Sequence, residues 1–167
     1  MPTLSVLVAS SGRSTLARTL LSISPQLTAG DELLVDVNDD APWGHAARNR
    51  MMLRARGDFL LFMDDDDVYT DGALALVRAH VAGMHDRVHI FQMRYGNGRP
   101  LWEAPGLRCG NVSTQVVCVP NSSDLLGEWG ERYEGDWDFI QHTCSNAAEL
   151  GLPEPCWHND VICEVRP

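Results

Sequence analysis

The sequence contains no lysine, so all thirteen of its basic residues are arginines. Schiff-base catalysis, pyridoxal phosphate chemistry and P-loop nucleotide hydrolysis each require a specific lysine, and the absence of lysine excludes these classes. No apolar stretch has the length of a membrane span, and the first residues do not form a basic-then-apolar leader. We therefore expect a cytoplasmic protein.

The five cysteines are odd in number and contain no CxxC pair, which argues against a disulfide framework. Cys156, His158 and Cys163 could supply three zinc ligands, but no fourth ligand stands at a typical spacing. Buried free thiols are the better interpretation.

The first half of the chain alternates between short apolar runs and segments of helical character. Strands are predicted over residues 4–9, 32–36 and 59–63, and helices over residues 14–27, over residues 46–56 and after Thr70 or Asp71. Repeated strand and helix alternation is typical of a parallel sheet covered by helices.

The second half is less regular. We expect strands over residues 87–95, 115–119 and 157–165, a hairpin at residues 96–98 and a helix over residues 135–150. At 167 residues, the chain has the size of one domain. We therefore predict a single α/β domain, with a nucleotide-binding half (1–83) and a compact second half (84–167).

Four consecutive aspartates, Asp64 to Asp67, follow the most hydrophobic of the predicted strands. In open α/β sheets, ligands bind beyond the carboxyl ends of the strands. Adjacent carboxylates raise one another's pKa unless a cation or hydrogen-bond donors compensate. The run therefore predicts a site for Mn²⁺ or Mg²⁺, which prefer oxygen ligands. A solvated acidic turn is the alternative.

Calcium-binding and phosphatase loops fit the acidic run less well. An EF-hand loop beginning at Asp64 or Asp67 fails, because Tyr69 would stand where a glycine or a ligand is required. Asp64-x-Asp66-x-Val68 is similar to the aspartyl-phosphate loop of haloacid-dehalogenase-type phosphatases. In those enzymes the loop usually follows the first strand, and a downstream lysine or, occasionally, arginine is also required. Here the run follows the third predicted strand and the chain has no lysine, so a phosphatase is a distant alternative.

These residues resemble the GT-A glycosyltransferases of family 2. The similarity is carried by the first strand, by Ala46-Ala-Arg-Asn-Arg50 and by the stretch from Ala55 to Asp67. It implies a GT-A, Rossmann-like fold with three α/β/α layers and a mainly parallel mixed sheet. It also implies a nucleotide-sugar donor, with a UDP-sugar as the default.

The resemblance implies that Asp64 and Asp66 form a DxD motif in which Asp66 ligates the metal. Asp64 or Asp65 would contact the ribose or the metal's waters. Arg48 would lie near the nucleotide, although an exposed helix arginine is an equal alternative. The other donor residues implied are Ala9, Ser11, Arg13, Asp36 and Asn38.

Glu134-Gly-Asp-Trp-Asp138 looks like the acceptor-side motif of the family. This alignment makes Asp136 the candidate general base of an inverting transfer, with helix capping as the competing role. His158 could complete the metal shell, as a histidine late in the chain does in some GT-A enzymes. A lone histidine is more often structural.

The chain departs from the family pattern near the nucleotide. Ser10 and Ser11 stand where an aromatic residue is common, and Asp36-Val37 replaces a pair of aspartates, although Asp39 follows shortly after. Trp43 could supply the missing stacking surface. These changes concern the identity of the nucleotide more than the class of reaction.

The short second half implies an open acceptor site. A glycan, a lipid-linked glycan, a protein or a modified nucleobase are all compatible acceptors, although the net charge of −10 disfavours DNA. The competing functions are nucleotidyl transfer on a similar fold and a non-catalytic module that binds a sugar nucleotide or a glycan. The oligomeric state is left open.

Overall fold

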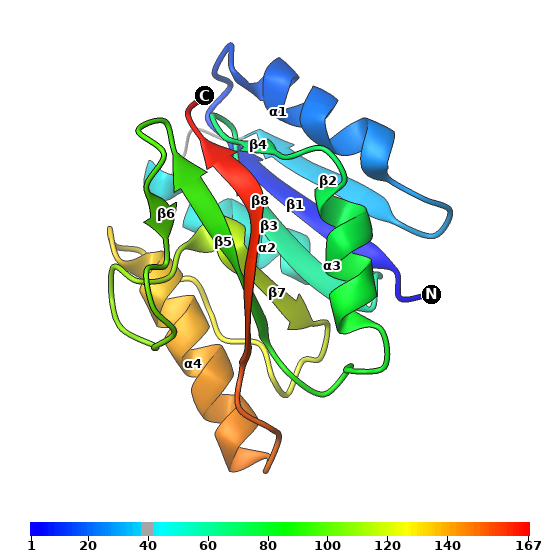
Figure 1. Ribbon diagram of the computed structural model, residues 1–167, viewed down its shortest axis with the longest axis vertical. Coiled ribbons are helices and arrows are strands. Elements are labelled where there is room, and N and C mark those ends of the chain that lie inside the picture. Colours follow the sequence, from blue (N-terminus) through cyan, green and yellow to red (C-terminus); the bar gives the residue numbers. More distant parts are fainter. Residues whose placement is uncertain (38–41) are drawn as a thin grey trace.

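A mixed eight-stranded sheet forms the centre of the structure, a computed structural model that describes residues 1–37 and 42–167 (Figure 1). The strand order is β2-β1-β3-β7-β5-β8-β4, with β6 beside β5. The strands are β1 (Leu4–Ser10), β2 (Glu32–Val37), β3 (Phe59–Asp64), β4 (Val68–Tyr69), β5 (His89–Tyr95), β6 (Pro100–Leu101), β7 (Val117–Pro120) and β8 (Cys156–Val165). Strands from both halves of the chain thus belong to one sheet.

The parallel part of the sheet is formed by the first three strands. β1 lies between β2 and β3, and its Ala9 pairs with Asp36 on one side and with Asp64 on the other. All seven residues of β1 are buried, which explains its continuous apolar run, because a central strand is covered on both faces. The carboxyl ends of these three strands therefore meet at one edge.

Four helices complete a three-layer α/β/α arrangement, with α1 and α3 in front of the sheet in Figure 1 and α2 and α4 behind it. Their bounds are α1 (Leu16–Ile23), α2 (His45–Met52), α3 (Ala73–Val81) and α4 (Gly135–Glu149), and shorter 3-10 turns cover Ser24–Gln26, Pro42–Gly44 and Thr114–Val116. The predicted α/β class and layering are confirmed. None of the helices among the described residues has the length and apolarity needed to cross a membrane.

Helix α2 ends at Met52, four residues before the predicted end. The amide of Ala55 donates to the carbonyl of Met51, which closes the last turn. Gly57 then passes so close to β1 that a Cβ atom would lie 2.6 Å from the backbone nitrogen of Ser5. Gly57 thus serves close backbone packing and does not cap the helix.

The second half contains more antiparallel pairing than the sequence suggested. β7 runs antiparallel to both β3 and β5, β6 runs antiparallel to β5, and β8 runs antiparallel to β4 of the first half. Among the described strands of this half, only β5 and β8 are parallel, with register shifts between Ile90 and Met93. The short strands β4 and β6 carry too little periodic sequence for their pairing to be predicted.

An aromatic stack joins the sheet to the helices behind it. The rings of Trp129 and Phe139 are stacked 4.5 Å apart, and Phe62 of β3 meets both rings edge-on. Such stacks add to the stabilisation from apolar burial. They hold the N-terminal half of α4 against β3, which helps to position the site described next.

A cleft lined by carboxylates

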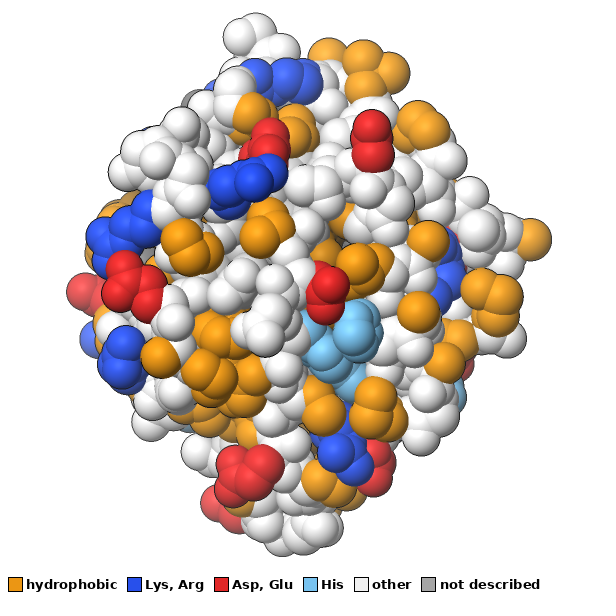
Figure 2. Space-filling view, in the orientation of Figure 1, with side chains coloured by type: hydrophobic (Ala, Val, Ile, Leu, Met, Phe, Trp, Pro, Cys, Tyr) orange, Lys and Arg blue, Asp and Glu red, His pale blue; other side chains and the backbone are white. Residues whose placement is uncertain are grey.

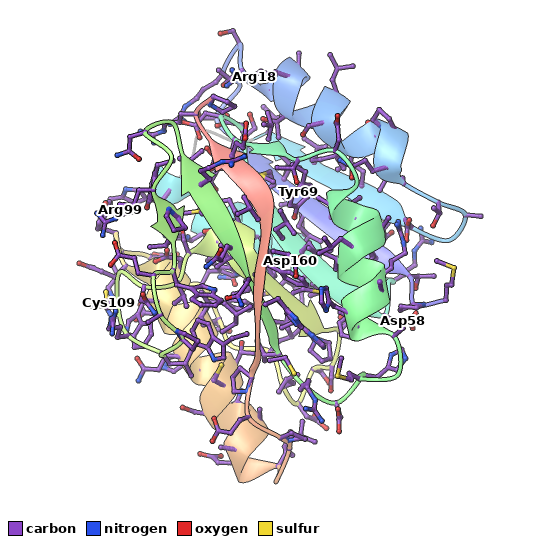
Figure 3. All side chains as sticks on the ribbon, viewed as in Figure 1. Arg18, Asp58, Tyr69, Arg99, Cys109 and Asp160 are labelled. Atoms are coloured by element: carbon purple, nitrogen blue, oxygen red, sulfur yellow. The ribbon has the colours of Figure 1, made fainter. Side chains whose placement is uncertain are left out.

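A cavity of about 1130 Å³ opens beyond the carboxyl ends of β1 and β3. Both halves of the chain contribute to its wall. The predicted residues Ala9, Ser11, Arg13, Arg48, Asp64, Asp65, Asp66 and Asp136 all line it, together with His45, Trp43, Gln115, Cys109, Tyr133 and Arg166. Cys109 lies on the long loop that follows β6 (Figure 3).

Three aspartates of the acidic run form the group that could hold a metal ion. Carboxylate oxygens of Asp64, Asp66 and Asp67 lie within 4.8 Å of one another. The tight turn from the carbonyl of Asp64 to the amide of Asp67 (3.5 Å) brings them together. Sequence reasoning selected Asp64 and Asp66 but overlooked Asp67, which carried the same signal as its neighbours.

Asp65 holds the loop that follows β1. Its carboxylate accepts hydrogen bonds from the hydroxyl of Ser10 (2.7 Å) and the backbone nitrogen of Ser11 (3.1 Å). The hydroxyl of Ser10 in turn accepts from the backbone nitrogen of Gly12. Asp65 therefore shapes the wall of the cleft on which Ser11 and Arg13 lie.

Two arginines face the carboxylate of Asp66. Arg13 Nη1 lies 2.8 Å and Arg166 Nε lies 3.0 Å from Asp66 Oδ2. Both guanidinium groups are largely exposed to the cleft, and so they are placed to meet an anionic ligand bound beside Asp66. Arg13 was a predicted donor residue, whereas no sequence signal pointed to Arg166.

The two remaining carboxylates of the run accept hydrogen bonds from protein groups; the side chain of Asp64 is 37% exposed, whereas Asp67 is buried. Gln115 Nε2 donates to Asp64 Oδ2 (2.9 Å) and also to Asp67, and the backbone nitrogen of Arg166 donates to Asp67 Oδ1 (2.9 Å). Burial, followed by the charge of Asp64, raises the pKa of Asp67 to about 7. Burial also raises the pKa of Asp64, and the charges of Asp66 and Asp65 add to this, against the opposing charge of Arg48.

Arg48 is buried and is not an exposed helix arginine. Its guanidinium pairs with Asp64, donates to the carbonyl of Trp43 (2.7 Å) and lies 4.8 Å from the centre of the Trp129 ring. His45 lies beside it, and burial followed by the charge of Arg48 lowers the pKa of His45 to about 4. The imidazole of His45 is therefore neutral at neutral pH.

Asp136, in the first turn of α4, also lines the cleft. Its Oδ1 accepts from the backbone nitrogen of Trp137 (2.7 Å). Burial raises the pKa of Asp136, and the charge of Asp64 adds to this effect. Hydrogen bonds from Trp137 and Ser113 oppose the rise. A carboxylate with this environment can accept a proton from a bound hydroxyl.

An aromatic pair stands at the mouth of the cleft. The rings of Trp43 and Tyr133 meet edge-on with centres 6.3 Å apart, and both side chains are exposed. Trp43 was considered as a replacement for the aromatic residue missing after β1, whereas Tyr133 was not predicted.

Two predicted site residues lie outside the cleft, and a third is not among the described residues. Asp36 forms a two-pronged ion pair with Arg50 (3.0 and 3.1 Å) and is absent from the described lining. Asn38 lies outside the described residues. His158 lies on β8 among His80, His89 and Phe91, seven positions from the end of the strand at Val165. A strand rises about 3.3 Å per residue, so His158 is too far away to ligate a metal at the acidic run.

The sequence profile of glycosyl transferase family 2 matches residues 35–126, which is more than half of the chain. The chain belongs to this family. This confirms the resemblance seen in the acidic run and the helix before it. No curated protein sequence matches this family 2 domain.

Solved structures show the same fold. TarS from S. aureus in complex with UDP-GlcNAc superposes with a TM-score of 0.69 at 17% identity, covering 99% of this chain and 58% of that one. Glucosyl-3-phosphoglycerate synthase from Mycobacterium tuberculosis in complex with Mg²⁺ and UDP gives a TM-score of 0.68 at 17% identity, covering 99% and 72%. The same synthase in complex with Mn²⁺ and UDP-glucose gives 0.66 at 18% identity, covering 96% and 70%. The family 2 domain thus spans only part of the length of these proteins.

Proposed function

We propose that this domain transfers a sugar from a uridine diphosphate sugar to an acceptor hydroxyl, with a divalent cation at the acidic run. One observation carries the proposal. Asp64, Asp66 and Asp67, at and after the end of β3, and Asp136, at the start of α4, line the same cavity. A metal site for a diphosphate and a separate base for an acceptor are the two parts that such a transfer requires.

The residues of the run suit a hard divalent cation. One carboxylate oxygen from each of the three aspartates lies within 4.8 Å of the other two, and carboxylate oxygens are the ligands that such a cation prefers. Burial and the charge of Asp64 raise the pKa of Asp67 to about 7, and a cation bound beside it would favour the ionised carboxylate. A bound Mn²⁺ or Mg²⁺ would supply Lewis-acid stabilisation of the departing nucleoside diphosphate. Asp64, Asp66 and Asp67 would hold it.

Arg13 and Arg166 would bind the diphosphate itself. Both now pair with Asp66, and a cation at that carboxylate would weaken these ion pairs. Their exposed guanidinium groups could then turn towards the phosphate oxygens. Because the chain has no lysine, arginine is the only side chain that can supply a permanent positive charge here.

Asp136 would act as the base. It accepts the proton of the acceptor hydroxyl while that oxygen forms a bond to the anomeric carbon. The bond from the anomeric carbon to the phosphate oxygen breaks, and its electron pair leaves with the diphosphate. Attack from the face opposite the leaving group inverts the anomeric configuration.

The choice of a uridine nucleotide rests on the structural neighbours, which were solved in complex with UDP, UDP-GlcNAc and UDP-glucose. Trp43 is the candidate surface for the base, because its exposed indole lines the cleft. The acceptor's class and the cytoplasmic location stay predictions.

The first experiment measures the thermal unfolding midpoint with UDP, GDP and CDP, with and without Mn²⁺. Ligands that bind only the folded state raise the midpoint by mass action. We expect a rise with UDP that requires Mn²⁺, is lost in Asp66→Asn and is retained in Asp71→Asn, whose side chain is exposed outside the cleft. Release of UDP from UDP-sugars in the presence of candidate acceptors then tests turnover. No rise with any nucleotide would refute the donor site, and binding without turnover would favour a binding module.

A further inference from the structure

Two histidines and a cysteine come together on β5 and β8, away from the acidic cleft. His89 of β5 pairs directly with Cys156 of β8, and His158 follows two residues later. One ligand atom from each of these three residues lies within 4.8 Å of the other two. The sequence offers no fourth zinc ligand at a typical spacing from Cys156, His158 and Cys163. His89 is 67 positions before Cys156, and only the pairing of β5 with β8 brings it beside Cys156 and His158.

The donor atoms already face one another. His89 Nδ1 and His158 Nε2 are 3.0 Å apart, and their rings are stacked nearly parallel. In a tetrahedral shell with metal bonds of about 2.0 Å to nitrogen and 2.3 Å to sulfur, ligand atoms are separated by roughly 3.3–3.8 Å. Small side-chain rotations would therefore bring the three atoms onto one ion.

The surrounding groups orient these ligands. His89 Nε2 lies 3.1 Å from the carbonyl oxygen of Met84, so the proton is on Nε2 and Nδ1 offers its lone pair. A backbone carbonyl bound to the far nitrogen is the usual support of a metal-binding histidine. Arg87 Nη1 lies 3.7 Å from the sulfur of Cys156 and donates to it, which holds the sulfur beside the two histidines.

His89 Nδ1 and His158 Nε2 are 3.0 Å apart, so only one proton can lie between these two nitrogens. A metal ion in its place would be bound by the lone pairs of both nitrogens.

An ion can reach this cluster from solvent. Cys156 and His158 are only half-buried, and Figure 2 shows histidine side chains gathered on the open face over β8. His80 packs against His158 and bonds Asp160, which Figure 3 places midway along β8 on that face. Asp160 contributes a negative charge that offsets Arg87.

We propose that His89, Cys156 and His158 form a binding site for Zn²⁺ or a similar thiophilic transition-metal ion, which clamps β5 to β8. Nitrogen and sulfur ligands select such ions over Mg²⁺, Mn²⁺ and Ca²⁺. Three protein ligands leave a fourth position for water. The clamp sits at the start of the β5–β8 pairing, just before its register shifts, and metal binding there would stabilise the fold.

The test uses Co²⁺ as a spectroscopic probe for zinc on the reduced, metal-free full chain. We expect one equivalent of Co²⁺ to produce a thiolate-to-metal charge-transfer band that Zn²⁺ abolishes, and Zn²⁺ to raise the thermal midpoint. Cys156→Ser should lose the band, and Cys109→Ser, which removes the thiol in the acidic cleft, should keep it. The proposed glycosyl transfer is tested separately, by the Mn²⁺-dependent rise of the thermal unfolding midpoint with UDP.

His158→Gln provides a second variant if Cys156→Ser does not fold. It should weaken Co²⁺ binding at least about tenfold, because even the loss of a residue that supports a ligand typically costs about 10- to 100-fold in affinity, and circular dichroism verifies its fold. No charge-transfer band in the wild-type chain would overturn the proposal. A charge-transfer band that persists in Cys156→Ser would also overturn the proposal, because another thiolate would then bind the metal. A band that is lost in Cys109→Ser would overturn it as well, because the metal would then lie at Cys109.

Discussion

The buried guanidinium of Arg48 on α2 pairs with Asp64 at the end of β3. Only 2% of the Arg48 side chain is exposed, and it also stacks over Trp129. The pair joins the acidic run to the aromatic stack that positions α4. One interaction thus couples the candidate metal site to the helix that carries Asp136.

Arg48→Met tests this coupling. The variant leaves Asp64 without its counter-charge and loses the contact with Trp129, so we expect the free energy of unfolding to fall by about 2–4 kcal/mol. Urea denaturation measures it. Arg99→Met is the control, because Arg99 pairs with Glu103 on the surface (Figure 3) and should change stability by less than about 0.5 kcal/mol. Equal effects of the two variants would contradict a structural role for the Arg48 pair.

A second buried pair, distant from the cleft, makes stability depend on pH. Asp31 accepts hydrogen bonds from Leu4 and Thr28 and pairs with Arg78, and both charged side chains are almost completely buried. Burial alone would raise the pKa of Asp31, but these hydrogen bonds outweigh it and lower the pKa below its ordinary value of 3.8. The stabilisation is therefore complete above that value and is lost as the pH falls through the lower, folded-state pKa.

Asp31→Asn should accordingly cost about 3–5 kcal/mol at about pH 7, because it leaves Arg78 buried without a counter-charge. The difference from wild type should persist to about pH 5 and shrink only below the ordinary aspartate pKa. Urea unfolding across this range measures both. The exposed Asp71→Asn serves as control, and a difference that does not vary with pH would contradict the assignment.

Much of this architecture could be predicted because its signals are local. The buried run of β1, the apolar β3 and the aspartates after it follow from composition and period alone. Other site residues depend on long-range pairing: Gln115 reaches Asp67 only because β7 joins β3, and Arg166 reaches Asp66 only because β8 ends beside it. His158 was assigned to the wrong cluster for the same reason, since its partner His89 is set by the β5–β8 register.

Asp136→Asn should abolish transfer while leaving the donor site intact. Loss of a general base typically costs about 10²–10⁴-fold in rate, whereas the amide oxygen of the new side chain could still accept the hydrogen bond from Trp137. We expect kcat to fall by this factor and the Mn²⁺-dependent midpoint shift with UDP to be unchanged. Asp138→Asn is the matched control, because Asp138 pairs with Arg132 (2.7 Å) and does not line the cavity. Unchanged turnover in Asp136→Asn would remove Asp136 from the mechanism.

Trp43→Ala examines the nucleotide's stacking partner. Stacking of a base on an aromatic side chain is worth about 1–3 kcal/mol, so the dissociation constant of UDP with Mn²⁺ should rise by roughly 5- to 150-fold. Calorimetry measures it. Tyr133→Ala removes the other aromatic ring at the mouth and should weaken acceptor use more than UDP binding. If both variants bind UDP as wild type does, the base lies elsewhere.

Gly135→Ala tests whether close packing places Asp136. In most helices this exchange stabilises by about 1 kcal/mol. Here the new Cβ would lie 2.2 Å from the carbonyl oxygen of Gly130 and 2.7 Å from the ring of His45, so the first turn of α4 must shift. Such overpacking costs about 1–3 kcal/mol.

A movement of about 1 Å at a reacting group can cost about 10²-fold in rate, so we expect turnover to fall more than stability in Gly135→Ala. Gly96→Ala is the control, because that glycine also lines the cleft but has open space around its Cβ position. The two measurements are kcat and the urea midpoint. If Gly135→Ala is less stable than wild type but has the same kcat, the position of Asp136 does not depend on Gly135. Gly135 would then contribute to stability only.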